Sequence, residues 1–312
     1  MKTAILGCGL IGRSWALVFA RGGHEVALWD QDPAQVQKAM SHIQRTLPEM
    51  ALAGLIDDPA RVLSRIHRAG TLEEALAGAG FVQENIAERA EPKQRLFADV
   101  ERFAAADAIL SSSTSAIMPS IIFSAVKTRE RCLVSHPLNP PHLAPIVEIC
   151  GADFTSAEAV ERARSFMAGC AMSPIIVKRE IEGFILNRLQ LAVLNEAFRL
   201  IDQDYVTAED LDKTLKDGLA LRWSFMGPIE TIDLNAPNGV ADYLDRYGPT
   251  IRRVGDSQSA AEPWPDSIGE KLQAERRATV PMDELGAATE WRDRRMMALA
   301  AHKLEQEKKK PR

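Results

Sequence analysis

The first half of the chain alternates short apolar runs with longer stretches in which apolar residues recur at helical spacing. Apolar runs at residues 3–6 and 25–30 flank a helical stretch over residues 14–21. Two more helices are predicted over residues 33–47 and 92–103, with a further helical stretch interrupted near Gly54 and Pro59. The remaining predicted strands lie at residues 80–84, 108–110, 131–135, 146–150 and 173–177. This alternation is typical of a doubly wound α/β sheet with crossover helices.

From Gly183 onward the pattern becomes helical only. Apolar residues then occupy nearly every face of one helix, namely Phe184, Ile185, Leu189, Val193, Ala197 and Leu200. Such a helix is either the buried centre of a helical domain or a subunit interface. Thr207, three residues before Asp210, is expected to cap the next helix. Residues 256–280 are poorer in apolar positions, and the sequence assigns them no role.

The first predicted strand leads into a glycine-rich turn, Gly7-Cys8-Gly9-Leu10-Ile11-Gly12. Gly7 permits the tight turn, Gly9 lets backbone amides approach a pyrophosphate, and Gly12 lets helix and strand pack closely. Asp30 ends the second strand, where its carboxylate can accept hydrogen bonds from a ribose and would repel a 2′-phosphate. We therefore predict a Rossmann-type NAD-binding domain, with Gly7, Gly9, Leu10, Ile11, Gly12 and Asp30 as cofactor-binding residues.

A length of 312 residues allows two domains, each with its own core. We expect a Rossmann-type NAD-binding domain over residues 1–181 and an all-α domain for substrate and dimerisation over residues 182–312. We expect the boundary near residues 180–182, where the alternating strand and helix pattern gives way to a helical one.

Composition narrows the kinds of partner. With 46% hydrophobic residues and a net charge of −5, neither a nucleic-acid nor a membrane partner is expected. The four cysteines are scattered, which fits a reducing cytoplasm and argues against a zinc site or a disulfide framework. The basic end of the chain, residues 308–312, is interpreted as a solvated tail.

Four polar features follow the glycine turn. They are Ser115 in a serine-rich turn, His136 in His-Pro-Leu-Asn-Pro, Glu148 on an apolar strand, and Asn187 at the start of the helical half. Each one alone has an ordinary structural explanation, since serine-rich turns are usually only turns and most histidines have no catalytic role. A metal site at His136 and His142 is not expected, because that loop supplies no third ligand.

Together these motifs resemble the L-3-hydroxyacyl-CoA dehydrogenase superfamily, whose members carry a TS motif, an H-x-x-N-P loop, a V-E strand and a GF-x-x-N-R helix start. The similarity extends from Met1 to at least Tyr247. Within the superfamily the chain is most similar to the branch of L-gulonate 3-dehydrogenase and λ-crystallin. The residues that carry this likeness are Ser111–Ser115, His136–Pro141, Leu186–Gln190, Gly227–Thr231 and Trp291–Asp293.

The resemblance implies a mechanism. His136 would act as the general base on a substrate C3 hydroxyl, and Glu148 would orient its imidazole. Ser115 and Asn187 would hydrogen-bond the reacting oxygen or His136, and so would contribute to catalysis and substrate binding. Further cofactor contacts are implied for Glu88, Lys93, Ser115 and Asn139. The resemblance also implies a homodimer.

The residues before Gly227 are the ones that indicate the class of substrate. We hypothesise that Arg222 anchors the carboxylate of a free hydroxy acid by a bidentate pair. The alternative is a surface arginine on a loop. The first function expected is therefore NAD-dependent oxidation of a small L-3-hydroxy acid such as L-gulonate, in the cytoplasm.

Other functions stay open at this point. The same chemistry on an L-3-hydroxyacyl-CoA thioester is the alternative, and related branches oxidise carnitine or reduce diketo esters. A crystallin-like structural role is a third possibility, which the intact polar residues disfavour. A hydrolase built on Ser115, His136 and Glu148 would lack a G-x-S-x-G nucleophile elbow.

Overall fold

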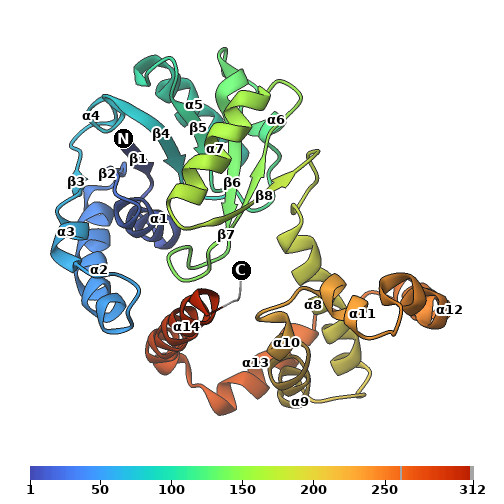
Figure 1. The fold of residues 1–312 in the computed structure, drawn as a ribbon. Helices are drawn as coiled ribbons and strands as arrows, with labels where there is room; N and C mark the ends of the chain where they lie inside the picture. The colour runs from blue at the N-terminus through green and yellow to red at the C-terminus, as the bar shows by residue number, and fades with distance from the viewer. Residues whose placement is uncertain (261, 310–312) are drawn as a thin grey trace. The chain divides into compact units, whose positions relative to one another are not determined.

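The computed structural model describes residues 1–260 and 262–309. They form two compact units, one of Met1–Arg188 with the chain from Trp291 onward, and one of Leu189–Glu290 (Figure 1). The predicted domain limits, at 181 and 182, stay a prediction. Of the basic tail, Lys310, Pro311 and Arg312 lie outside the described residues.

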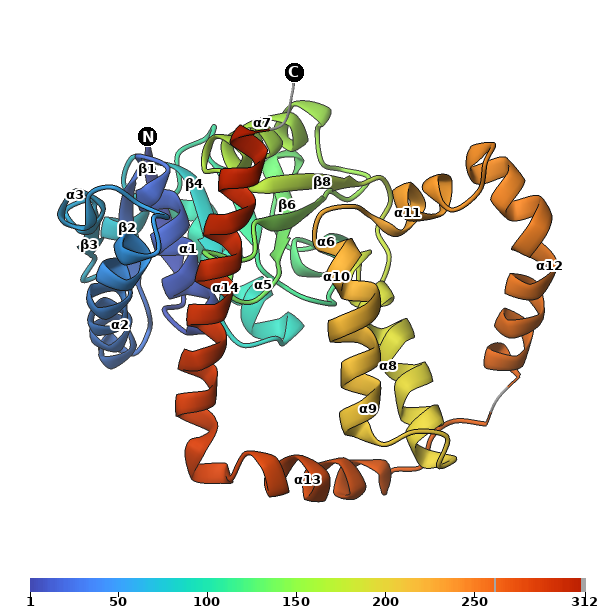
Figure 2. The same cartoon turned by 60° about the horizontal axis from the view of Figure 1, so that its bottom comes forward.

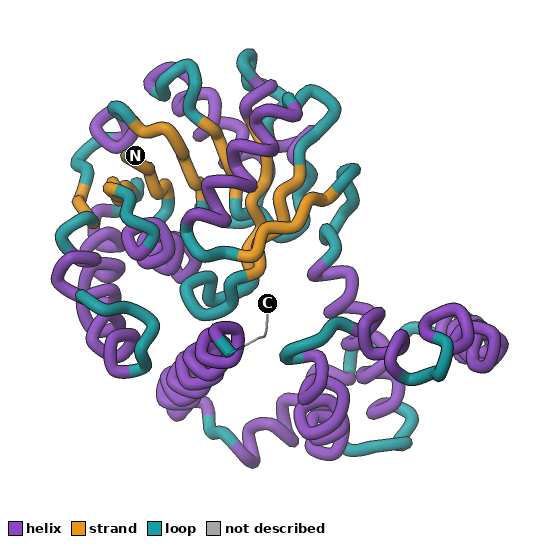
Figure 3. Tube along the Cα trace, viewed as in Figure 1, coloured by secondary structure: helices purple, strands orange, loops and turns teal. Residues whose placement is uncertain are grey.

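The first unit is built on one eight-stranded sheet with the strand order β3-β2-β1-β4-β5-β6-β7-β8 (Figure 3). The strands are β1 (Lys2–Leu6), β2 (Glu25–Trp29), β3 (Ile66–Arg68), β4 (Ala79–Glu84), β5 (Ile109–Ser112), β6 (Cys132–Pro137), β7 (Ile146–Cys150) and β8 (Ser173–Val177). The first six strands in sequence pair in parallel, whereas β7 is antiparallel to β6 and parallel to β8. The prediction of a doubly wound α/β sheet is confirmed, and β7 and β8 run opposite to the other six strands.

Helices cover both faces of this sheet, and successive residues of a strand alternate between two cores. Ile5 joins the core formed with α1 (Leu10–Arg21), α2 (Pro33–Leu52) and α7 (Ala157–Gly169). Ala4 and Leu6 join the opposite core, with α4 (Leu72–Leu76), α5 (Ala90–Phe103) and α6 (Pro119–Ile122). The short helix α3 (Pro59–Leu63) follows α2.

The last helix, α14 (Leu285–Lys308), returns to this unit, a position that the sequence did not predict. Its Met297 is buried in the core that contains α1 and α2, and Figure 2 shows α14 beside α1. Arg294 lies 3.3 Å from the carboxylate of Glu49 on α2. The part of α14 around Arg294 and Met297 thus packs within the first unit.

The second unit is helical. Its helices are most of α8 (Leu186–Asp202), α9 (Ala208–Lys213), α10 (Ala220–Trp223), α11 (Pro228–Leu234), α12 (Gly239–Ser259) and α13 (Ile268–Thr279). The predicted cap is confirmed, since Thr207 Oγ1 accepts the Asp210 amide at 3.2 Å. Residues 256–280 contain the end of α12 and all of α13, and Ala261 lies outside the described residues.

Two other expectations about helices need correction. On α8 only Ala197 and Ile201 are buried, whereas Leu189 is 64% exposed, so α8 is not the buried centre of the helical unit. Its alternative role as a subunit interface stays a prediction. The helix expected to end at residue 47 continues through Pro48 to Leu52, because its buried positions continue to Met50.

No helix in the described part of the chain combines the length and apolar character needed to cross a bilayer. The cytoplasmic location stays a prediction.

Candidate functional site

The glycine turn has the geometry that a pyrophosphate requires. Gly7 has φ +89°, and a Cβ on Gly12 would lie 1.9 Å from the carbonyl oxygen of Gly7. A side chain is therefore excluded at both positions. A Cβ on Gly9 would meet no protein atom within 4 Å, so space is open above the amides at the start of α1. That space and those amides fit the phosphates of a dinucleotide.

Asp30 follows β2 beside this turn. One carboxylate oxygen accepts the amide of Cys8 at 2.7 Å, and the other accepts the amide of Asp32 at 3.0 Å. The carboxylate is thereby held against the glycine turn while the residue stays half-buried. Its position next to the turn fits the predicted contact with an adenosine ribose.

His136 and Glu148 meet because β6 and β7 are antiparallel. The register places the two residues directly opposite each other, so their side chains project from the same face. His136 Nδ1 lies 2.7 Å from Glu148 Oε2, and both side chains are buried. An ionised carboxylate can only accept; opposite such a group, Nδ1 would carry the proton and Nε2 would be left to accept one.

Ser115 and Asn187 also come together. The side-chain amide of Asn187 donates to the backbone carbonyl of Ser115 at 2.7 Å. One oxygen of Glu88 accepts from the Ser115 amide at 2.7 Å, from its hydroxyl at 3.2 Å and from the Thr114 hydroxyl at 2.6 Å. Burial would raise the pKa of Glu88, but these hydrogen bonds and the Lys93 charge outweigh it and lower that pKa. Glu88 therefore holds the serine turn as an anion.

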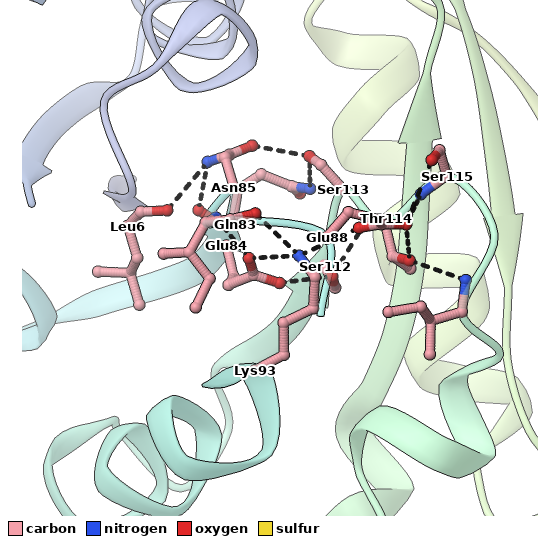
Figure 4. Close-up of polar contacts among 12 residues, drawn as sticks. Leu6, Gln83, Glu84, Asn85, Glu88, Lys93, Ser112, Ser113, Thr114 and Ser115 are labelled. Atoms are coloured by element: carbon pink, nitrogen blue, oxygen red, sulfur yellow. Dashed lines mark hydrogen bonds and ion pairs between the residues drawn. The ribbon is translucent and has the colours of Figure 1, made fainter. Parts of the chain in front are cut away.

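Lys93 lies beneath this turn rather than at its surface (Figure 4). Its ammonium donates to Glu84 Oε1 at 2.7 Å and to the Ile86 carbonyl at 3.2 Å, and it lies 3.5 Å from Glu88. Ser112 and the Ile86 amide also donate to Glu84. Burial raises the pKa of Glu84, and the Lys93 charge opposes that rise. The predicted cofactor contacts of Glu88 and Lys93 stay predictions.

A second set of polar residues links the serine turn to the glycine turn (Figure 4). Ser113 Oγ accepts from Trp15 Nε1 at 2.9 Å and from Gln83 Nε2 at 2.7 Å, and it donates to Asn85 Oδ1 at 2.7 Å. Asn85 in turn donates to the carbonyl of Leu6 at 3.3 Å. The Ser113 hydroxyl thus makes every hydrogen bond that it can, with Trp15 on α1, Gln83 on β4 and Asn85 just after β4.

Sequence reasoning missed Glu84, Gln83, Asn85 and Ser113. A signal was present, because Gln83-Glu84-Asn85 ends an apolar strand of a parallel sheet, as Asp30 does. Polar side chains at that edge of the sheet are expected to line a ligand site. Ser111 and Ser112 were expected in the turn, but both belong to β5 and are buried.

His142 is a poor alternative to His136 as the general base. It is buried, and burial together with the charges of Arg21, His42 and other cations lowers its pKa to about 3. Asn139 is exposed in the same loop. Within residues 1–260 and 262–309, no group of three His, Cys, Asp or Glu side chains is arranged to hold a metal ion.

Arg222 lies in the second unit, on the short helix α10 rather than on a loop, and is exposed. A π-helical stretch, Thr214–Leu219, comes directly before α10. Such stretches are rare and are frequent at functional sites.

The buried Lys93–Glu84 pair gives the first prediction. Replacing Lys93 by methionine leaves the Glu84 carboxylate buried without its counter-charge. We expect the free energy of unfolding to fall by about 3–5 kcal/mol, measured by urea denaturation. The double variant Lys93→Met with Glu84→Gln removes both charges and should recover much of that loss.

The matched control is Lys127→Met, which removes an exposed lysine of the same unit and should change stability little. A Lys93→Met protein as stable as the Lys127→Met protein would show that the pair does not stabilise this edge of the sheet.

Comparison with known proteins identifies two matching regions. Residues 2–181 match the profile of the 3-hydroxyacyl-CoA dehydrogenase NAD binding domain, and residues 183–284 match the C-terminal domain of the same enzymes. The segment after residue 284, which contains α14, lies outside both matches.

Individual relatives cover most of the chain. A λ-crystallin homologue of Bos taurus is 40% identical over 302 residues, which is 95% of this chain and 94% of the bovine protein. An L-carnitine dehydrogenase of Pseudomonas putida is 35% identical over 250 residues, 80% of this chain and 77% of that enzyme. The solved structure of an NAD⁺-dependent 5-formyl-3-hydroxy-2-methylpyridine 4-carboxylic acid 5-dehydrogenase shares the fold, with a TM-score of 0.83, 24% identity and 96% of each chain covered.

Proposed function

Because this chain belongs to the 3-hydroxyacyl-CoA dehydrogenase family and carries its NAD binding domain, we propose that it oxidises the C3 hydroxyl of a small L-3-hydroxy acid, such as L-gulonate, to the 3-keto acid. The observation that carries the proposal is the buried His136–Glu148 pair, which leaves Nε2 of His136 free. NAD, when bound, would accept the hydride that leaves the substrate's C3 carbon.

The chain's own residues divide the remaining work. Nε2 of His136 takes the proton of the C3 hydroxyl as the carbonyl forms, and Glu148 stabilises the imidazolium that results. Ser115 and Asn187, joined at 2.7 Å, orient the reacting oxygen. Each oxidation thus transfers one proton to the histidine and one hydride to the cofactor.

A thioester substrate is the second candidate. It is favoured by the match of both regions of the chain to 3-hydroxyacyl-CoA dehydrogenases. The free acid is favoured by the relatives that cover most of the chain, among them an L-carnitine dehydrogenase and λ-crystallin homologues. We propose, in addition, that the protein forms a homodimer and is located in the cytoplasm.

A substrate panel separates the candidates. L-gulonate, L-3-hydroxybutyrate, L-carnitine and 3-hydroxybutyryl-CoA are each offered with NAD and with NADP, and NADH or NADPH is followed by absorbance. Turnover of a free acid with NAD supports the proposal, and turnover of the thioester alone supports the second candidate. If none of the four compounds is turned over with NAD, both the free-acid and the thioester candidates are wrong.

Arg222 gives a test of the carboxylate anchor. Replacing it by methionine removes a bidentate charge-assisted pair, so KM for the hydroxy acid should rise by about 10- to 100-fold. KM for NAD should stay unchanged, because the anchor contacts only the acid. Initial rates measured over both substrate concentrations separate the two constants.

The control is Arg276→Met, which removes an exposed arginine of α13 in the same unit. It should leave both Michaelis constants unchanged. Equal behaviour of the two variants would identify Arg222 as an ordinary surface residue.

A further inference from the structure

Glu148 has a second set of partners besides His136. Its Oε2 pairs with Nδ1 of His136, while its Oε1 accepts the amides of Ile185 at 2.8 Å and Leu186 at 2.9 Å. These amides lie at the start of α8, where the first turn of a helix has no partners of its own. The carboxylate that holds the imidazole therefore also caps the helix that carries Asn187.

The chain reaches this helix through an unusual turn. Gly183 and Phe184 both have positive φ, +75° and +49°. A left-handed conformation is common for glycine but costs free energy for a bulky residue, so it persists only where the surroundings enforce it. Here the Phe184 amide donates to Ile181 at 3.1 Å, and the side chain is fully buried with Val134, Cys150 and others.

The conformation of Phe184 brings its ring against the catalytic candidate. The ring centroid lies 5.5 Å from that of the His136 imidazole, with the two planes inclined by 36°. The imidazole is thus held at Nδ1 by Glu148 and packed against the Phe184 ring. Both groups are attached to the same turn, one covalently and the other through the amides of Ile185 and Leu186.

We infer that Phe184 is a positioning residue for His136, and that the strained turn at Gly183–Phe184 exists to hold its ring in that place. Phe184 limits rotation of the imidazole about its own bonds, and Glu148 fixes which nitrogen carries the proton. Together they aim Nε2 at the substrate hydroxyl. This inference rests on the proposed role of His136 as the base.

The direct test is nuclear magnetic resonance of protein containing ¹⁵N-labelled histidine. The signals of His136 are assigned by their loss in His136→Gln. We expect one sharp set with the proton on Nδ1 in the wild type, and shifted or multiple signals in Phe184→Leu. Unchanged His136 signals in Phe184→Leu would overturn the inference.

The matched control is Phe97→Leu. Phe97 on α5 is equally buried, but its ring packs against that of Phe123, with 4.5 Å between the ring centroids, in a separate core cluster that does not include Phe184. This variant should lose stability and leave the His136 signals as in the wild type. If Phe184→Leu does not fold, Phe184→Met, whose flexible apolar side chain can fill the space of the ring, serves instead with the same expected signals.

Kinetics supply a second readout. Misplacing a catalytic group can cost about 100-fold in rate, so kcat of Phe184→Leu should fall about 10- to 100-fold while KM for NAD is retained. The kcat of Phe97→Leu, per folded molecule, should stay at the wild-type value. Full turnover by His136→Gln would refute the proposed function, whereas the resonance measurement tests the positioning whatever the substrate is.

Discussion

Replacing His136 by glutamine is expected to lower kcat by about 10²- to 10⁴-fold, the usual contribution of a general base. Glutamine retains a polar side chain of similar reach beside Glu148, but it cannot take a proton near neutral pH. The affinity for NAD should change little, because the glycine turn joins β1 to α1 and Asp30 follows β2, whereas His136 lies on β6. The measurements are the rate of NADH formation and a separate titration of NAD binding.

The control for His136 is His142, in the loop that follows β6. His142→Gln should keep most of the turnover, because burial and neighbouring cations lower the pKa of His142 to about 3 and make it a weak base. If His142→Gln loses as much activity as His136→Gln, the base has been assigned to the wrong residue.

The nucleotide-binding fold was predictable because its information is local. A strand, a glycine turn, a helix and a second strand ending in Asp30 follow one another within thirty residues. Each step depends on backbone rules, such as the positive φ of Gly7 and the contact of Gly12 with the Gly7 carbonyl. The NAD-binding fold and the family that this pattern indicated are confirmed.

The arrangement of His136 and Glu148 is less local. Resemblance suggested both residues, but their contact depends on β7 running antiparallel to β6 in a register that sets them opposite. Short buried strands have the same apolar pattern in either direction, so the sequence could not supply that direction. Their roles stay proposals.

Two buried contacts could not be predicted from the sequence. The cofactor contact of Lys93 stays a prediction, but the sequence did not show that its ammonium is buried against Glu84 at the end of β4. The return of α14 to the core of α1 and α2 joins segments more than two hundred residues apart. Neither hydropathy nor spacing encodes such pairs, because a buried lysine and an exposed one look the same in a sequence.

Replacing Glu148 by glutamine tests whether the negative charge of the carboxylate orients the His136 imidazole. The amide oxygen of glutamine can still accept from Ile185 and Leu186, so the start of α8 should remain capped. Its amide nitrogen, however, donates to Nδ1 of His136 and favours the tautomer with the proton on Nε2. That tautomer cannot take the substrate proton, so kcat should fall by about 10⁴-fold, as for the equivalent change in a serine protease triad.

Comparison with Glu148→Ala separates catalysis from stability. Alanine caps nothing, and each buried donor left without a partner costs about 1–3 kcal/mol. We therefore expect Glu148→Ala to unfold at clearly lower urea concentration than Glu148→Gln, while both variants are nearly inactive. Wild-type turnover in Glu148→Gln would contradict the orienting role of Glu148, and equal stability of the two variants would contradict its capping of α8. If both results are obtained, the same carboxylate orients the His136 imidazole and caps the first turn of α8, the helix that carries Asn187.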